Sequence, residues 1–474
     1  MTPPDWLAGA DRDSPWPTLT VTVAGTGVSG ASAVRALRSL GATVTAVDAA
    51  VDDAARARAA DLQALGATVV LGQAASITLP PGTQLIVTSP GWRPDAPLLA
   101  NAAAAGIPVW GDVELAWRLR AQGAAPWLAI TGTNGKTTTV GMLAAILEAD
   151  GRRAAAVGNV GAPILDAVLA ADPYDVLAVE LSSFQLHWAP SVAPLAGAVL
   201  NIAPDHLDWH GSFEAYAEDK AAIWRGNAVA IGNADDSATA GRLARVDGRR
   251  VTFTLAEPAA GQLGVRGGWL VDRAFSEAPR RLATATRLRP AGAHNVGNAL
   301  AAAGLALSAG VGTDAVAAGL ANYRPDGHRN ELVLRRDDVA WVDDSKATNP
   351  HAAAASLASY DSIVWIAGGL NKGLDFDELV RLAAPRLRAA VLLGECRRHI
   401  AEALARHAPD VPVVDVGSTE TTAMVAVVQE AAALARRGDT VLLAPAAASM
   451  DMFRDYKHRG DVFAEAVRAL AGRG

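Results

Sequence analysis

The sequence is poor in cysteine and lacks both a membrane-length apolar run and a signal peptide. Cys396 is the only cysteine, so an intrachain disulfide and a cysteine metal cluster are excluded, and we expect its thiol to be buried as a small apolar group. The alanine-rich run 299–311 is too short to cross a membrane and predicts a buried helix. Residues 1–16 lack the basic start and apolar centre of a secretion signal. These absences predict a cytoplasmic protein without membrane insertion, which we expect to be a monomer.

Basic surface patches are also missing from the sequence pattern. The chain has 42 Lys and Arg against 49 Asp and Glu, for a net charge of −7, and no basic run interleaved with aromatic residues. Nucleic acid is therefore not an expected partner. The hydrophobic fraction of 51% and the charged fraction of 19% favour packed cores over disorder. The length of 474 residues suggests about three domains.

Three regions are expected, at residues 1–113, 114–325 and 326–474. Short strands alternate with helices in the first and third regions, which predicts α/β domains with parallel sheets. A glycine-rich stretch, 251–271, is expected as a small β insertion in the middle region, 108–123 as a bridge, and 323–327 as a hinge. Strands are predicted at 19–24, 43–47, 68–71, 85–88, 127–130, 176–179, 196–200, 340–342, 363–366, 390–393, 411–414 and 441–443. Helices are predicted at 31–40, 53–65, 140–149, 213–223, 295–309 and 462–471.

A glycine-containing turn lies between the apolar run 127–130 and the helical run 140–149. Backbone N–H groups at such a turn bind phosphate, a lysine adds a full positive charge, and a hydroxyl binds Mg²⁺. A strand–turn–helix with a capping threonine is the alternative, but it does not explain the lysine. The motif therefore predicts an ATP site made by Gly132, Thr133, Asn134, Gly135, Lys136, Thr137 and Thr138.

A second glycine motif, Gly25 to Gly30, follows the first predicted strand. Asp48 ends the next strand, as in a dinucleotide-binding fingerprint. A tight strand–helix turn and an NAD site are both compatible with this spacing. The geometry favours a bound nucleotide diphosphate without identifying a nicotinamide.

Polar residues follow several other predicted strands. Glu180 comes after an apolar run, where an idle charge would be costly, so we expect it to bind Mg²⁺. His206 is either a metal ligand or an ordinary turn histidine. Asn295 and Asn298 share one helix face, where their amides would contact adenine or cap the helix.

The third region begins with Arg329, which is placed to reach phosphates or simply to be solvated. Polar groups are concentrated at 343–349, and Lys372 and Ser449 also follow predicted strands. Lysine and hydroxyl groups in these positions suit a carboxylate-bearing ligand.

In this order the motifs resemble those of the Mur ligases, the ATP-dependent amide-forming enzymes of peptidoglycan precursor synthesis. The loop 131–138 is shared with folylpolyglutamate synthetases, whereas 180–186 and 344–349 resemble the glutamate-adding branch. The similarity runs from about residue 21 to residue 460. It implies an N-terminal Rossmann-like domain for the UDP sugar, a central P-loop ATPase domain and a C-terminal Rossmann-like domain for the amino acid. It also implies ligation of glutamate, expected as D-glutamate, to UDP-N-acetylmuramoyl-L-alanine, and roles in cell-wall synthesis, cell shape and division.

The resemblance also implies residue roles. Lys136, His206 and Lys220 are expected to be catalytic, and ATP contacts are added by Asn295, Asn298, Arg329 and Asp344. Two Mg²⁺ ions are implied, with Thr137, Glu180, His206 and a carbamylated Lys220 as their ligands. The UDP substrate is expected at Gly27, Ser29, Gly30, Asp48, Ser89, Gly91, Asn159, Ser182 and His206. Glutamate is expected at Lys346, Thr348, Lys372, Ser449 and Tyr456.

Four residues depart from the family pattern. Leu370 replaces an acid, Tyr456 stands where phenylalanine is common, and Ala49 and Ala50 follow Asp48 where side-chain donors occur. These departures concern contact details rather than the reaction class. Three alternatives remain open: a related ligase for a different amino acid, an NAD-dependent oxidoreductase, and a non-catalytic nucleotide-binding regulator.

Overall fold

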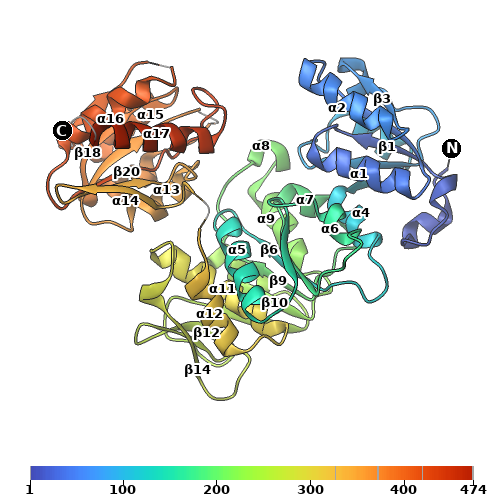
Figure 1. The fold of residues 1–474 in the computed structure, drawn as a ribbon, viewed down its shortest axis with the longest axis horizontal. Helices are drawn as coiled ribbons and strands as arrows, with labels where there is room; N and C mark the ends of the chain where they lie inside the picture. The colour runs from blue at the N-terminus through green and yellow to red at the C-terminus, as the bar shows by residue number, and fades with distance from the viewer. Residues whose placement is uncertain (1, 326, 371–372, 419, 472–474) are drawn as a thin grey trace. The chain divides into compact units, whose positions relative to one another are not determined.

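The computed structural model describes residues 2–325, 327–370, 373–418 and 420–471. The chain forms three β-sheets, each covered by helices, and Figure 1 colours them in succession along the chain. The three-domain α/β fold predicted from the sequence is therefore confirmed. Contact density divides the chain into two compact units, residues 1–285 with 297–323, and residues 286–296 with 324–474.

The first sheet is parallel and has the strand order β3-β2-β1-β4-β5. Its strands alternate with helices as expected, and the segment 108–123 is a strand and a helix rather than a simple bridge. The elements are β1 (Thr20–Ala24), α1 (Val28–Ser39), β2 (Thr43–Asp48), α2 (Asp53–Ala64), β3 (Thr68–Leu71), β4 (Leu85–Thr88), α3 (Pro97–Ala104), β5 (Val109–Gly111) and α4 (Asp112–Arg118).

The second sheet has nine strands in the order β14-β13-β12-β11-β10-β9-β6-β8-β7. The stretch 251–271 lies within this sheet, because β11 pairs with β10 and continues into the antiparallel edge strands β12–β14. The strands are β6 (Trp127–Thr131), β7 (Ala154–Gly158), β8 (Val176–Glu180), β9 (Ala196–Val199), β10 (Val229–Asn233), β11 (Arg249–Phe253), β12 (Gln262–Arg266), β13 (Trp269–Asp272) and β14 (Arg280–Thr284). The helices are α5 (Lys136–Ala149), α6 (Ile164–Val168), α7 (Ser183–His187), α8 (Leu207–His210), α9 (Phe213–Ala221), α10 (Ser237–Leu243), α11 (Ala293–Ser308) and α12 (Thr313–Asn322).

One continuous apolar core joins the first two sheets. Helix α4 contributes to this core, and its Glu114 accepts hydrogen bonds from the backbone and hydroxyl of Ser191 at 2.9 and 2.5 Å. This shared core explains why the first two sheets fall in one compact unit. The predicted boundary at 113/114 lies inside α4 and stays a prediction.

The third sheet has the order β15-β16-β20-β17-β18-β19, with β15 antiparallel and the other strands parallel. Helices α13, α14 and α15 pack on one apolar core, and α16 and α17 pack on another, which contains Phe463. Cys396 is fully buried, as expected. The elements are β15 (Glu331–Arg336), β16 (Val339–Asp343), α13 (Pro350–Leu357), β17 (Ile363–Ala367), α14 (Asp377–Ala383), β18 (Leu387–Leu392), α15 (Arg397–His407), β19 (Val413–Asp415), α16 (Ala423–Leu434), β20 (Thr440–Leu443) and α17 (Tyr456–Ala471).

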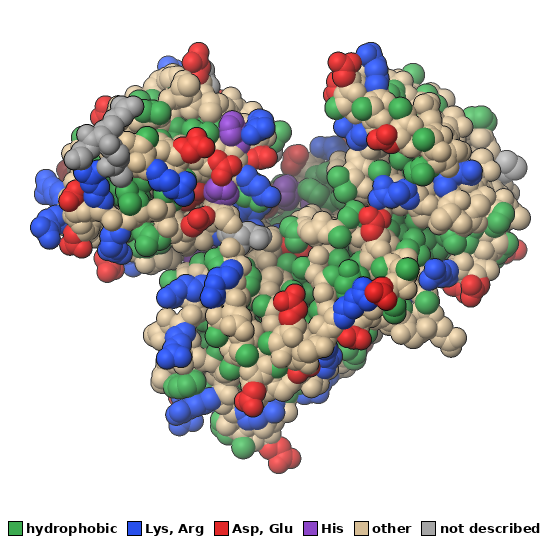
Figure 2. Space-filling model, in the orientation of Figure 1, with side chains coloured by type: hydrophobic (Ala, Val, Ile, Leu, Met, Phe, Trp, Pro, Cys, Tyr) green, Lys and Arg blue, Asp and Glu red, His purple; other side chains and the backbone are tan. Residues whose placement is uncertain are grey.

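The surface carries both acidic and basic side chains. On the face shown in Figure 2, acidic and basic side chains are interspersed rather than gathered into one basic field. Among the described residues, no helix is long and apolar enough to cross a membrane.

Candidate active site

Strand order places the predicted catalytic residues at one edge of the central sheet. β6 lies between β8 and β9, with Ile130 opposite Glu180 and Thr131 opposite Val199. Because these strands are parallel, their carboxyl ends meet, as do the segments that follow them. The phosphate loop, Glu180 and the segment that begins at Asn201 therefore come together.

The phosphate loop is closed by hydrogen bonds to the segment after β9. The Asn134 N–H donates to Asn201 Oδ1 at 2.8 Å, and the Asn201 amide donates back to the Asn134 carbonyl at 3.1 Å. The Thr133 hydroxyl lies 2.9 Å from the hydroxyl of Tyr216. Gly135 has a φ of 87° at the N-cap of α5, where a side chain would be strained. A Cβ there would also collide with the Asn298 side chain, which explains why glycine ends the loop.

Two lysine ammonium groups converge on one carbonyl oxygen. Lys136 Nζ donates to the Gly132 carbonyl at 2.8 Å, and Lys220 Nζ donates to the same oxygen at 2.9 Å. Lys220 is only 2% exposed. Burial, followed by the charge of Lys136, holds the pKa of Lys220 well below its usual value, although nearby carboxylates act in the opposite direction. This environment favours the neutral amine of Lys220.

Glu180 has the free ligand atom that a cation needs. Its side chain is 1% exposed, and Oε1 accepts a hydrogen bond from the Asn159 amide at 2.8 Å. Oε2 is buried with no hydrogen-bond partner, which is costly for a carboxylate. Among the described residues, no three His, Cys, Asp or Glu side chains form a ready-made metal cage. The residues therefore fit a Mg²⁺ ion held by one carboxylate together with substrate phosphates, the usual protein environment of that ion.

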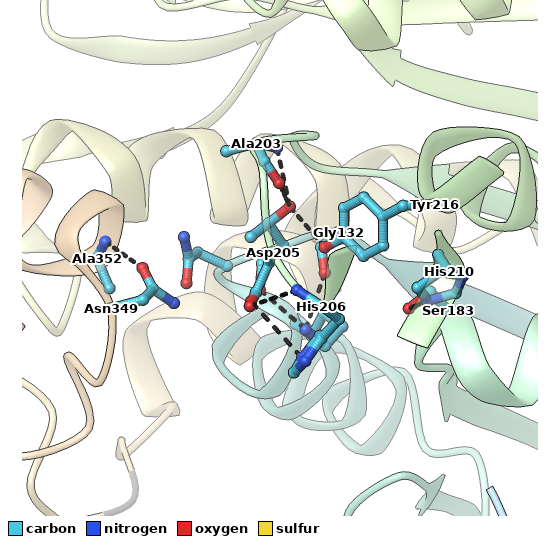
Figure 3. A network of polar contacts seen from close by, with 12 residues as sticks. Gly132, Ser183, Ala203, Asp205, His206, His210, Tyr216, Asn349 and Ala352 are labelled. Atoms are coloured by element: carbon cyan, nitrogen blue, oxygen red, sulfur yellow. Dashed lines mark hydrogen bonds and ion pairs between the residues drawn. The ribbon is translucent and has the colours of Figure 1, made fainter. Parts of the chain in front are cut away.

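His206 lies at the start of α8 in the left-handed region, with a φ of 52°. Its Nε2 is 3.6 Å from an Asp205 oxygen (Figure 3). The centroid of its ring is 4.8 Å from that of the Phe184 ring. Burial lowers the pKa of His206, and the charges of Lys220 and Lys136 lower it further against the effect of Asp205. A neutral imidazole is the form that binds metal. His206 therefore lies close enough to both lysines for their charges to act on it. The sequence left open whether His206 is a metal ligand or a turn residue, and this position fits a metal ligand.

The glycine loop of the first domain is held by Asp48. Oδ2 of Asp48 accepts from the N–H and hydroxyl of Thr26, each at 2.8 Å, and Oδ1 accepts from the Ala50 N–H at 3.0 Å. Burial would raise the pKa of Asp48, but these hydrogen bonds lower it overall. Asp48 therefore shapes the loop, and it also lines the adjoining cavity.

Close backbone packing explains the glycines of this loop. A Cβ at Gly30 would collide with the Gly25 carbonyl, whereas a Cβ at Gly27 would have no atom within 4 Å. The Ser89 hydroxyl is buried without a hydrogen-bond partner and lies against Gly25. A cavity of about 530 Å³ adjoins the loop and is lined by Asp48, Ala49, Gly91, Trp92, Arg93, Asp95, Ala96 and Pro97. Asp48 and Gly91 were expected here from the sequence; Trp92 and Arg93 were not, and their only signal was their place after β4.

Ser182 and Asn159 flank Glu180. Ser182 is the N-cap of α7 and forms a capping box with Gln185. The Asn159 side chain is tied to Glu180, as described above. Ser29 lies near Asp112, a buried acid that sequence reasoning missed; burial raises the pKa of Asp112 to about 6, against a lowering effect of Ser29. Asp112 gave no signal because it resembles an ordinary acid in the first turn of a helix.

The predicted adenine residues lie on α11. The Asn295 amide donates to the Ala291 carbonyl at 2.9 Å, and Asn298 lies against Gly135. In the third sheet, the Asn330 N–H donates to Asp344 at 3.3 Å, and burial raises the pKa of Asp344 to about 6. Arg329 is close enough to lower that pKa electrostatically.

Several predicted glutamate-binding residues are close together in the third sheet. Lys346 Nζ lies 3.9 Å from the centroid of the Tyr456 ring. The Ser345 hydroxyl donates to the Tyr456 carbonyl at 2.8 Å, and Leu370 pairs with Ala448, the residue before Ser449. Thr348 follows Lys346 in the loop after β16. Lys372 lies outside the described residues. The loops after β16, β17 and β20 therefore meet, as the parallel strand order requires.

Tyr216 was missed by sequence reasoning although it contacts one predicted ATP-binding residue, Thr133, and one predicted catalytic residue, Lys220. Its hydroxyl pairs with Thr133, and Lys220 Nζ lies 4.7 Å from its ring centroid. The available signal was its position four residues before Lys220 on the same helix face.

Family profiles match three consecutive segments of the chain. Residues 19–111 match the Mur ligase MurD-like N-terminal domain, 130–306 the Mur ligase middle domain, and 328–447 the Mur ligase glutamate ligase domain. The UDP-N-acetylmuramoylalanine–D-glutamate ligase of Streptomyces avermitilis is 61% identical over 464 residues, covering 96% of this chain and 99% of that protein. The protein of the same name from Thermobifida fusca is 59% identical, covering 95% and 98%.

Solved structures show the same fold at low identity. The UDP-N-acetylmuramate–alanine ligase MurC of Thermotoga maritima has a TM-score of 0.58 and 19% identity, covering 95% of this chain and 99% of that one. A pseudomurein peptide ligase type C from Methanothermus fervidus has a TM-score of 0.59 and 18% identity, covering 96% and 100%. With near full-length relatives at about 60% identity and all three domain profiles in order, the chain belongs to the Mur ligase family.

Proposed function

We propose that the protein joins D-glutamate to UDP-N-acetylmuramoyl-L-alanine at the cost of one ATP, in peptidoglycan precursor synthesis. The names of the relatives that are 59–61% identical support this substrate pair. The chain is an ATP-dependent ligase, so neither an oxidoreductase nor a non-catalytic regulator is needed to explain the Gly25–Gly30 motif. Because two of the substrates, ATP and the UDP-linked acceptor, are nucleotides, we place the reaction in the cytoplasm, and we propose a monomer as the working unit.

The reaction transfers the γ-phosphoryl group of ATP to the terminal carboxylate of the acceptor. The resulting acyl phosphate is attacked by the glutamate amine, and phosphate leaves through a tetrahedral intermediate. The difficulty is electrostatic, because a carboxylate must approach a polyphosphate. Lys136 supplies a fixed positive charge at this point, and the backbone N–H groups of the loop orient the phosphates. Mg²⁺, when bound, neutralises phosphate charge; Glu180, Thr137 and His206 are the residues proposed to hold it.

The single observation that carries this proposal is the convergence at the Gly132 carbonyl. Lys136 and Lys220 both donate to it, in the segment next to the unpartnered Glu180 oxygen. A phosphate loop alone fits many enzymes. A second, buried lysine beside it is unexplained by simple nucleotide binding.

Carbamylation of Lys220 is a further part of the proposal. Two ammonium groups beside one carbonyl would repel a metal ion, whereas a carbamate would offer it oxygen ligands. Carbamylation requires the neutral amine, and the lowered pKa of Lys220 supplies it. The other proposed contacts are the ATP residues Asn295, Asn298, Arg329 and Asp344, the substrate residues around Asp48, and Lys346, Thr348, Ser449 and Tyr456 for glutamate.

The test is an amino-acid panel with UDP-N-acetylmuramoyl-L-alanine, ATP and Mg²⁺, scored by phosphate release. D-Glutamate is expected to support the fastest release, and L-glutamate is the stereochemical control. Equal rates with other amino acids would reject the glutamate assignment. No release with any amino acid would reject the ligase reaction on this acceptor.

A further inference from the structure

A chain of partly buried hydrogen bonds links three short helices near the proposed metal ligands. His210 Nδ1 lies 2.8 Å from Asp219 Oδ2, and His210 Nε2 lies 3.0 Å from Ser183 Oγ. The His210 side chain has no exposed surface, and Ser183 is 2% exposed. Figure 3 shows Ser183 and His210 side by side, on the far side of Tyr216 from the loop segment at Ala203. None of these three residues is needed by the reaction described above.

The order Ser–His–Asp is also that of a hydrolase triad. In a hydrolase the serine oxygen must reach a substrate carbonyl. Ser183 is buried in the first turn of α7, and its hydroxyl is directed at His210. Ring packing closes this region further, since Phe184 stacks on His210 at 5.4 Å and Trp209 lies 4.4 Å from it, centroid to centroid. Nucleophilic chemistry is therefore disfavoured, and the hydrogen bonds need another explanation.

The position of the three residues along the chain supplies that explanation. Ser183 begins α7, three residues after Glu180; His210 ends α8, which starts next to His206; Asp219 lies on α9 immediately before Lys220. Each partner is thus close to one proposed metal ligand. α8 has only four residues, too few to be stable alone, so its placement must come from tertiary contacts.

We propose that the Asp219–His210–Ser183 hydrogen bonds fasten α8 to α7 and α9, and thereby set the spacing of His206, Glu180 and Lys220 at the metal site. His210 is then a positioning residue, and both of its ring nitrogens are used, one for each neighbouring helix. The inference rests on the proposed function in one respect only, that these three residues hold a metal. Groups behind metal ligands typically change metal affinity 10–100-fold when removed.

His187 provides a matched control. It lies 3.0 Å from the same Asp219 carboxylate, but it is on α7, so that bond does not hold α8. Its ring packs edge to face on Trp209 of α8 at 5.1 Å between centroids, a contact that phenylalanine retains. H210F retains an aromatic ring for the packing with Phe184 and Trp209 while removing both hydrogen bonds. H210Q restores one donor and one acceptor. H187F removes a bond to Asp219 of the same kind without releasing α8.

The full-length variants are compared by three measurements. Hydrogen–deuterium exchange of segment 203–212 reports the placement of α8. Mn²⁺ binding in the presence of ADP, followed by electron paramagnetic resonance, reports the metal site without turnover. The kcat and KM values are measured for ATP and for the UDP substrate.

H210F is expected to lose protection in segment 203–212, to bind Mn²⁺ about tenfold more weakly and to lose kcat by a similar factor, with little change in either KM. H210Q should recover part of each loss, and H187F should resemble the wild type. Unchanged Mn²⁺ affinity in H210F, even with a lower unfolding temperature, would reduce His210 to a structural residue and overturn the inference. Equal effects of H187F and H210F would also overturn it. Absence of glutamate-dependent turnover in the wild type would instead reject the proposed function, while exchange and Mn²⁺ binding would still decide the role of His210.

Discussion

The Lys136 ammonium group donates to two carbonyls of its own loop, those of Gly132 and Thr133. Such an arrangement holds the charge ready at the phosphate position. Lys136→Ala is expected to lower kcat by about 10²–10³-fold, as when one preorganised donor of a transition state is removed. Phosphate release gives the rate, and calorimetric titration with the UDP substrate is the control, since that affinity should stay within experimental error. Near-normal release would contradict the ATP assignment.

Carbamylation of the buried Lys220 would explain its place at the proposed metal site better than a free ammonium group does. Lys220→Ala should lose activity, and acetate or formate should restore part of it by supplying the missing carboxylate oxygens. The exposed Lys457 offers a matched substitution, Lys457→Ala, which should neither lose activity nor respond to added carboxylate. A Lys220→Ala variant with full activity, or with a loss that no short carboxylate relieves, would reject the carbamate.

The contribution of the buried Asp112 to the free energy of unfolding depends on pH. Its folded-state pKa is about 6 against 3.8 for the ordinary carboxyl, so the folded protein keeps a proton between these values that the unfolded chain releases. Wild-type stability should therefore fall as pH rises from about 4 to 7, relative to Asp112→Asn, by at most about 3 kcal/mol. Denaturant midpoints of both proteins at pH 5 and pH 8 test this. A difference between the two proteins that does not grow with pH would show that Asp112 titrates normally.

At the scale of secondary-structure elements, two glycines of the turn between β1 and α1 can be compared by alanine substitution. Gly30→Ala would drive a Cβ into the Gly25 carbonyl, whereas Gly27→Ala enters open space at a φ of −70°. We expect Gly30→Ala to weaken binding of the UDP substrate by more than about tenfold, because the backbone that approaches the diphosphate must shift. Gly27→Ala should also weaken binding of the UDP substrate, because its Cβ would enter the open space that the second glycine of the motif leaves for the diphosphate, but without straining the loop as Gly30→Ala does. ATP affinity should be unchanged in both variants, and an unchanged affinity of Gly27→Ala for the UDP substrate would show that the diphosphate does not lie against Gly27.

At the scale of the whole molecule, the two compact units have separate apolar cores. In the unit of residues 1–285 with 297–323, one apolar core spans two sheets and a second lies in the first sheet, whereas the third sheet has its own cores. Calorimetry should therefore resolve two unfolding transitions. UDP substrate should raise only the transition of the first unit, because a ligand stabilises the part whose folded state binds it.

The control for this experiment is a core variant of the third sheet. Trp365 is fully buried there. Trp365→Ala should therefore lower the free energy of unfolding of the unit that contains the third sheet by about 3–5 kcal/mol, as is typical of a large-to-small core substitution, and so lower the temperature of its transition. A single transition whose temperature is shifted both by UDP substrate and by Trp365→Ala would show that the units unfold together.

The sequence by itself determined the class of fold and the chemistry of the phosphate loop. Strand–helix alternation is local: β3 and β4 have the predicted bounds, and most other predicted strands begin and end within one residue of the observed ones. β7, β10 and β15 were not predicted, since Ala154–Gly158 is alanine-rich and β15 is a half-exposed edge strand whose pairing comes from β16. The stretch 251–271 resembled an insertion because its pairing with β10 is not visible in its own residues.

Only the tertiary structure decided which polar residues work together. Nothing in the spacing of Lys136 and Lys220 shows that both reach the Gly132 carbonyl, because that meeting depends on how α9 packs against the end of β6. The same holds for Tyr216 at Thr133, for Asp112 at Ser29 and for His210 between Ser183 and Asp219. Local patterns follow from backbone periodicity and turn chemistry within a few residues. Burial, shared hydrogen-bond acceptors and shifted pKa values arise from groups distant in sequence, and they exist only once parallel strand order has brought those groups to one edge of the sheet.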